Sequence, residues 1–238
     1  MNNRVLVMVA LAAGLFLGGR AWPKSGNEGK LVDSGSFGIY VQGRRVATET
    51  FSIRQRPDVS ITVAEFKTED GRENQSSELQ IASNGDLRHY QWRGPDKAQT
   101  TVVYSDQFLV EHVTSGAGVK PVELPFMLPP STVLLDDNFF VHREVLLWRY
   151  LASMCGPAPL PAGCQTGRFG VFIPRQQTPA TVQLEYKGKE KIAIRGAEHE
   201  LDRFSLVTDG VEWALWMGPD YKLVRILVPS ERVEVLRD

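Results

Sequence analysis

Residues 139–154 read FFVHREVLLWRYLASM, and this stretch decides the fold. A helix built from it is apolar on nearly every side, and its polar exceptions are His142, Arg143, Glu144 and Arg149. A helix that is apolar all round is buried on most of its sides. We therefore predict one buried helix over 139–154 that needs protein walls around it.

The residues next to this helix predict where it begins and ends. Asp137 or Asn138 is a suitable N-cap, and Gly156 followed by Pro157 is a stop signal. The polar residues at the helix start allow two interpretations. One is capping together with a single hydrogen-bonded histidine, and the other is a polar gate at the mouth of a cavity. The residues concerned are Asp136, Asp137, His142 and Glu144.

Short strands are predicted on both sides of the helix. Apolar and polar residues alternate over 36–113 and again over 167–235, and turn signals such as Asn84-Gly85 separate the strands. Nothing alternates with these strands in a helical pattern, which argues against a parallel sheet. The predicted fold is mainly β, with a large curved antiparallel meander, a half-open barrel, wrapped around one central apolar helix. Residues 34–238 form a single β-rich domain in this interpretation.

The N-terminal segment predicts export. Residues 5–17 are an uninterrupted apolar run that is short for a bilayer span, and small residues follow it. We interpret residues 1–21 as a signal peptide, with an uncleaved N-terminal anchor as the alternative, and residues 22–33 as a flexible lead-in. The protein is then periplasmic or extracellular, and only an uncleaved N-terminal segment would join it to a membrane.

The chain has two cysteines, Cys155 and Cys164, separated by a short proline-rich stretch. An even count in an exported chain indicates a disulfide. No histidine lies near the pair to complete a zinc site.

Composition and motifs limit the possible chemistry. The 238 residues carry 27 Lys and Arg against 28 Asp and Glu, a formal charge of −1, so the basic footprint of a nucleic-acid-binding protein is missing. The sequence has no G-x-S-x-G elbow, phosphate-binding loop, dinucleotide fingerprint or H-E-x-x-H motif. We therefore predict no catalytic residue, no cofactor and no metal ligand.

Large aromatic side chains are numerous for a β-rich chain. Core packing is their ordinary role, and a pocket wall is the functional alternative, because apolar ligand sites have aromatic and aliphatic walls. The predicted pocket candidates are Trp92, Phe140, Trp148, Phe172, Trp213 and Trp216.

The order of these elements resembles a known group. The opening GSFGIYVQGRRVATETFSI at 35–53 and the segment LPPSTVLLDDNFFVHREVLLWRYL at 128–151 look like uncharacterised bacterial periplasmic proteins. Their architecture is similar to the lipoprotein-carrier superfamily of LolA and LolB type. The resemblance implies an incomplete antiparallel barrel that folds round a helical lid and holds acyl chains.

Three functional hypotheses follow. The first is a non-enzymatic exported bacterial envelope protein that binds a lipid or another apolar molecule between sheet and helix. The second is an envelope scaffold with a filled core, which binds a protein partner through edge strands or the proline-rich 114–135 segment. The third is a hydrolase whose site, a serine or acid beside a histidine, forms only in three dimensions.

Overall fold

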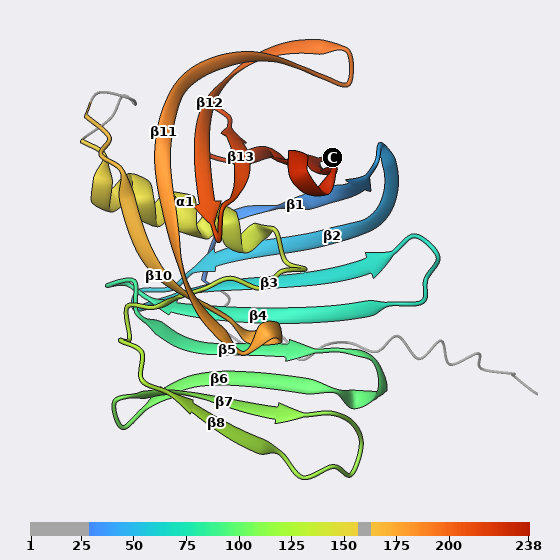
Figure 1. Cartoon of the computed structure of the whole chain (residues 1–238), viewed down its shortest axis with the longest axis vertical. Coiled ribbons are helices and arrows are strands. Elements are labelled where there is room, and N and C mark those ends of the chain that lie inside the picture. The colour runs from blue at the N-terminus through green and yellow to red at the C-terminus, as the bar shows by residue number, and fades with distance from the viewer. Residues whose placement is uncertain (1–28, 157–162) are drawn as a thin grey trace, which may run out of the picture.

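A single curved sheet of fifteen strands dominates the computed structural model, which describes residues 29–156 and 163–238 (Figure 1). The mainly β prediction is confirmed. One α-helix, α1 (Val141–Met154), and three short 3-10 turns, η1 (Pro95–Lys97), η2 (Pro174–Gln176) and η3 (Pro229–Glu231), complete the described elements. The strands are β1 (Lys30–Val41), β2 (Arg44–Gln55), β3 (Val59–Thr68), β4 (Asn74–Ala82), β5 (Leu87–Arg93), β6 (Gln99–Ser105), β7 (Phe108–Thr114), β8 (Val122–Phe126), β9 (Val133–Leu134), β10 (Gly167–Ile173), β11 (Thr178–Ile194), β12 (Ala197–Thr208), β13 (Val211–Met217), β14 (Leu223–Val228) and β15 (Val233–Arg237).

The sheet consists of two antiparallel meanders that are joined edge to edge. Its order is β8 to β1 in descending sequence, followed by β15 to β9. Strands β1 and β15 pair antiparallel at the join, with Phe37 opposite Arg237 and Val41 opposite Val233. The pair β9 and β10 is parallel. The first and last described strands therefore lie side by side in the middle of the sheet.

The curvature of the sheet brings its two halves around α1. Figure 1 shows the helix on the concave side, between the β1–β4 strands and the β10–β13 strands. The half of the sheet that ends in β9 meets the other half at the start of β5. There, Leu87 N donates to Pro130 O, just before β9, at 3.0 Å. Strands β6, β7 and β8 continue the sheet beyond this contact.

The largest core cluster lies between the helix and both halves of the sheet. Leu146, Leu147 and Tyr150 of α1 pack in it with side chains such as Phe37 of β1 and Phe204 of β12. Burial of the helix on most sides is thus observed. The polar residues of the first turn, His142, Arg143 and Glu144, are buried as well. The apolar pattern of the helix does not explain their burial.

Several boundaries differ from the sequence expectation. The helix begins at Val141, and neither Asp137 nor Asn138 makes a side-chain cap. Strand β1 begins at Lys30, so residues 30–33 of the expected lead-in are strand. Strand β11 is one continuous strand of 17 residues with a register shift at Tyr186/Gly188.

Cys155 and Cys164 form the predicted disulfide, directly after the helix. The expected signal peptide or anchor, 1–21, and most of the lead-in lie outside the described residues. Among the residues with described positions, no helix has the length and apolar character needed to cross a bilayer.

Candidate functional site

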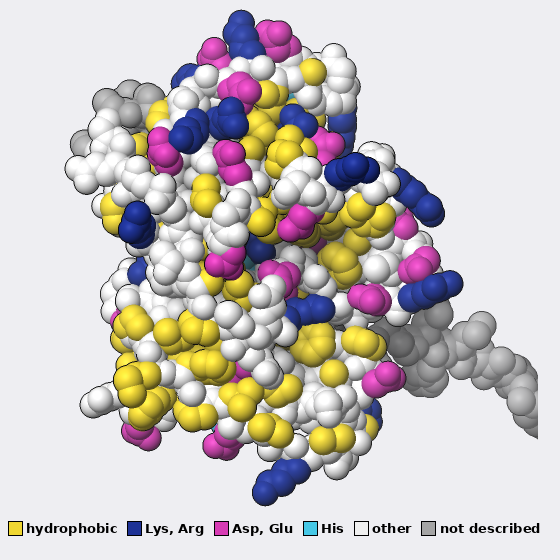
Figure 2. Space-filling view, viewed as in Figure 1, with side chains coloured by type: hydrophobic (Ala, Val, Ile, Leu, Met, Phe, Trp, Pro, Cys, Tyr) yellow, Lys and Arg dark blue, Asp and Glu magenta, His cyan; other side chains and the backbone are white. Residues whose placement is uncertain are grey.

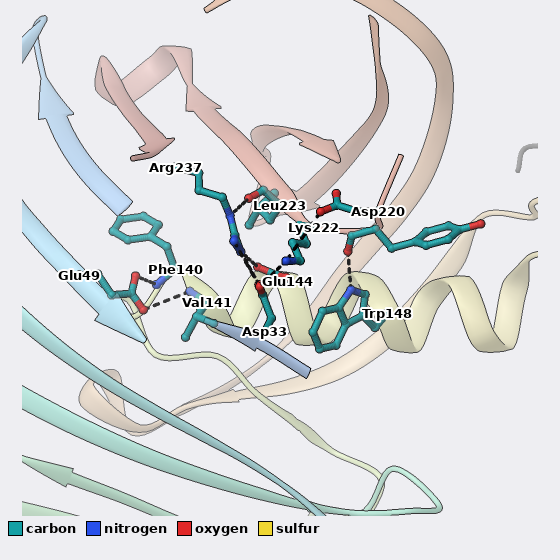
Figure 3. A network of polar contacts seen from close by, with 11 residues as sticks. Asp33, Glu49, Phe140, Val141, Glu144, Trp148, Asp220, Lys222, Leu223 and Arg237 are labelled. Carbon is teal, nitrogen blue, oxygen red and sulfur yellow. Dashed lines mark hydrogen bonds and ion pairs between the residues drawn. The ribbon is translucent and has the colours of Figure 1, made fainter. Parts of the chain in front are cut away.

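A buried carboxylate from the sheet binds the N-terminal end of α1. Glu49 of β2 accepts hydrogen bonds from Phe140 N at 2.8 Å and Val141 N at 3.2 Å (Figure 3). These are two of the amides that a helix leaves without partners at its start. Burial raises the pKa of Glu49 to about 8, although both amide bonds and the Arg143 charge oppose that rise. A distant strand therefore caps the helix, in place of the expected local residue.

A second set of buried polar groups surrounds His142. Tyr90 of β5 donates from its hydroxyl to Asp136 Oδ2 at 2.5 Å, and Asp136 N donates to His142 Nδ1 at 3.2 Å. The other ring nitrogen of His142, Nε2, is buried without a partner. Burial lowers the pKa of His142 to about 3, so the ring is neutral. Only one of the two ring nitrogens of His142 therefore has a hydrogen-bond partner.

Arg143 lies fully inside the protein beside these groups. Its Nη1 donates to the carbonyl oxygens of Asp136 and of Phe139, the latter at 3.1 Å. Its guanidinium carbon lies 4.8 Å from the ring centroid of Trp213 and 5.6 Å from that of Phe140. Arg143 thus secures the loop before the helix and stacks on two aromatic rings.

The first turn of the helix also contacts the middle of the sheet, through Glu144 (Figure 3). Arg237 of β15 donates to Glu144 Oε2 at 3.2 Å and also pairs with Asp33 of β1. Lys222 Nζ lies 3.1 Å from Asp33 Oδ1. Burial, and after it the hydrogen bond with Asp33, raises the pKa of Glu144 to about 9. These contacts hold α1 against the paired β1 and β15 strands.

An apolar cavity of about 610 Å³ lies on another side of the helix, next to β4 and β9. We call it the Arg149 cavity, because Arg149 is the one charged side chain among the described residues that line it. Its Nη1 donates to Gly85 O in the β4–β5 turn at 3.0 Å. The apolar walls are formed by Leu79, Ile81, Leu87, Val133, Leu134, Val145, Leu146 and Trp148.

A second cavity, of about 490 Å³, lies at the N-terminal end of the helix. We call it the Trp213 cavity. Its walls are Ile39, Phe66, Phe140, Ile173, Val211, Trp213 and Val233, and its charged lining residues are Asp137, Asp209 and Glu231. Strand β3 contributes Ser60 to the first cavity and Phe66 to the second, so the two cavities lie toward opposite ends of the same strand.

The predicted aromatic candidates are distributed over several places. Phe140 and Trp213 line the Trp213 cavity, and Trp148 lines the Arg149 cavity. The Nε1 of Trp148 also donates to Tyr221 O at 2.6 Å. Trp92 donates from Nε1 to Gln75 Oε1 at 3.0 Å, and Phe172 is fully buried in a second cluster beneath β5–β7. Trp216 packs in a separate cluster with Ile194, Leu201 and Ala214. These six side chains do not form one pocket.

One acid lies beside a histidine at the edge of the sheet, where Glu123 Oε1 is 3.5 Å from His112 Nδ1. Within residues 29–156 and 163–238, no serine hydroxyl donates to a histidine nitrogen in the contacts observed. The same described residues contain no group of three or more His, Cys, Asp or Glu side chains placed to hold a metal ion.

Sequence reasoning named the buried acids Asp136 and Glu144 but missed Glu49 and Asp33. Glu49 shares one strand face with the apolar residues Ala47, Phe51 and Ile53. An isolated acid on an apolar strand face is a signal that could have identified it. Asp33 gave no such signal, because it lies in a polar stretch of sequence.

Comparison with known proteins adds a fold likeness. No family model matches the chain, and no curated protein matches it. The solved structure of a β-barrel-like protein of the domain of unknown function DUF1849 from Brucella abortus is similar, with a TM-score of 0.53 and 7% sequence identity. The match covers 86% of this chain and 94% of that chain. At this identity the likeness concerns the fold.

Proposed function

We propose that this protein is an exported, non-enzymatic binding protein that holds an apolar ligand with an anionic group in the Arg149 cavity. The observation that carries the proposal is a cavity of about 610 Å³ with aliphatic and aromatic walls and one cationic lining residue. Ligand sites in proteins have this size range, mostly apolar walls and a few polar groups that orient the ligand.

The position of Arg149 supports this ligand class. The side chain is half-buried, with its guanidinium carbon 5.9 Å from the ring centroid of Phe169. Burial lowers the pKa of Arg149, and the neighbouring Asp86 opposes that effect. A carboxylate or phosphate at the end of an acyl chain would pair with this partly dehydrated cation, while the chain lies along the apolar walls.

The export part of the proposal rests on the N-terminal sequence and on the disulfide between Cys155 and Cys164. The carrier role implied by the lipoprotein-carrier resemblance agrees with a helix inside a curved sheet. An acyl-bearing ligand is therefore our preferred occupant.

Binding of palmitate and of hexadecanol, measured by calorimetry, tests the proposal. We expect palmitate to bind more tightly, Ala152→Phe to abolish binding by filling the cavity, and Arg149→Met to weaken palmitate alone. Arg168→Met, an exposed arginine on β10, is the matched control and should leave binding unchanged. Wild-type protein that binds neither probe, and that shows no lipid in native mass spectra after gentle purification, would refute the proposal.

A scaffold role is the second candidate, and one observation favours it. Strand β8 forms an edge of the sheet within the proline-rich 114–135 segment. Exposed apolar side chains gather near this edge, with Val122 56% exposed and Met127 84% exposed. Figure 2 shows hydrophobic side chains over the β5–β8 part of the molecule. Such a surface suits a protein partner. Crosslinking to a partner that Val122→Lys abolishes, with palmitate binding unchanged, would support this role.

A further inference from the structure

The Trp213 cavity differs from the Arg149 cavity in charge. Three carboxylates line it, Asp137, Asp209 and Glu231, and none of its described lining residues is a lysine or arginine. The Arg149 cavity has the opposite character, with one arginine and no acid among its described lining residues. One helix is thus flanked by two cavities of similar size whose charged lining residues have opposite signs.

Two of these carboxylates are available to a ligand. Asp209 in the β12–β13 turn and Glu231 in η3 are exposed, and the side chains of both lack a hydrogen-bond or ion-pair partner among the described residues. Asp137 is already engaged, because its Oδ2 accepts from Gln176 Nε2 at 2.8 Å and its Oδ1 lies 3.9 Å from Arg143 Nη2.

We call the carboxylates of Asp137, Asp209 and Glu231 the rim of the Trp213 cavity. The other walls of this cavity are mostly apolar and partly aromatic. The rings of Phe140 and Trp213 are tilted by 39° with their centroids 6.5 Å apart, and aliphatic side chains from β1, β10, β13 and β15 also line the cavity. Arg143 already stacks on both rings. Because the Arg143 cation already lies against both rings, the groups left for a ligand cation are the unpaired carboxylates of Asp209 and Glu231, and the apolar walls are left for an apolar body.

From this arrangement we infer that the Trp213 cavity is a second binding site, which takes an organic cation with an apolar or aromatic body. Aromatic walls and carboxylates are the groups that recognise alkylammonium ligands. The inference is independent of the proposal for the Arg149 cavity, because the two sites share no described lining residue.

The test compares phenethyltrimethylammonium with its uncharged carbon isostere. Binding is measured by calorimetry, and the site is located through the NMR signal of the Trp213 indole N–H, assigned with Trp213→Phe. We expect the cation to bind more tightly than the isostere and to shift that signal. The double variant Asp209→Asn/Glu231→Gln should weaken cation binding by about fivefold at low salt, and less at high salt.

Asparagine is suited to the left-handed backbone of Asp209, where φ is 48°, so this variant preserves the turn. The matched control is Glu198→Gln/Glu200→Gln, which removes the same charge from exposed positions on β12. It should leave binding of the cation unchanged. The inference fails if the control weakens binding equally, if the isostere binds as tightly as the cation, or if the Trp213 signal does not move. Binding of palmitate by the rim variant should match wild type, which separates this result from the proposal for the other cavity.

Discussion

Arg237 Nη2 donates a hydrogen bond to Glu144 Oε2 at 3.2 Å, so the last described strand is joined to the buried helix through a polar contact. The same guanidinium pairs with Asp33 and lies over the rings of Phe37 and Phe51, at 5.5 and 5.1 Å from their centroids. The guanidinium of Arg237 thus contacts two buried acids, Asp33 and Glu144. Both acids lose their interaction with water on folding.

Replacing Arg237 with methionine should destabilise the protein strongly. The methionine retains an unbranched chain against the two phenylalanine rings but leaves Asp33 and Glu144 without the guanidinium. Removing one partner of a buried ion pair costs about 3–5 kcal/mol. Urea denaturation measures the change. Arg195→Met, which removes an exposed pair with Asp238, is the control and should shift stability by less than about 1 kcal/mol. Equal losses in the two variants would contradict our account.

Substitution of Glu49 should destabilise the start of the helix. Glu49→Ala leaves the amides of Phe140 and Val141 unpaired inside the protein, and we expect a loss of about 2–3 kcal/mol. Glu49→Gln keeps one side-chain oxygen as an acceptor and should cost less than alanine. Hydrogen exchange at these two amides, compared with amides in the middle of α1, measures the effect. Unchanged protection in Glu49→Ala would show that the carboxylate does not cap the helix.

The free energy of unfolding should fall as the pH rises from about 4.5 to about 9. Glu144 has a raised pKa of about 9 when folded, mainly because of burial, whereas its ordinary value is 4.5. The folded state therefore retains a proton that the unfolded state releases across this window, and each such group contributes up to about 1.4 kcal/mol per pH unit. Glu49 adds to the slope up to about pH 8.

Glu144→Gln tests this pH dependence directly, because glutamine cannot ionise. Denaturation at several pH values between 5 and 8 should show a shallower slope than wild type. Glu200→Gln, an exposed acid on β12, should keep the wild-type slope. A wild-type slope in Glu144→Gln would mean that this residue ionises equally in the folded and unfolded states.

The disulfide should stabilise the end of the helix. Cys155 and Cys164 are nine residues apart, and closing a loop of this length contributes about 2–3 kcal/mol in the chain-entropy description. The variant Cys155→Ser/Cys164→Ser should lose about that amount in urea denaturation. Its stability should not respond to a reductant, whereas wild type should approach the variant when reduced. A wild-type protein that is insensitive to reductant would contradict the prediction.

Much of the architecture followed from local sequence. The apolar stretch 139–154 predicted the helix to within two residues at its start, and Asn84-Gly85 predicted a turn between β4 and β5. These features depend on residues close in the chain. The predicted disulfide also depended on nearby residues, together with the inferred compartment.

The groups around the helix depend on distant residues, so they were not predicted. Glu49 meets Phe140 across 91 positions, and Arg237 meets Asp33 across 204. Charged residues in the first turn of α1 looked like exceptions on an otherwise apolar surface, and only the sheet supplies their partners. The cavities could not be predicted for the same reason, because the Trp213 cavity takes its lining from widely separated strands and turns.

The central pairing of β1 with β15 has a consequence for how the protein is made. Val41 cannot pair with Val233 until all of the intervening chain has left the ribosome. The edge of β1 that faces β15 therefore stays unpaired throughout synthesis. Such distant pairing is slow to form. During that delay, the unfinished chain would benefit from protection against aggregation, and a chain shortened by its final strand would keep that edge exposed permanently.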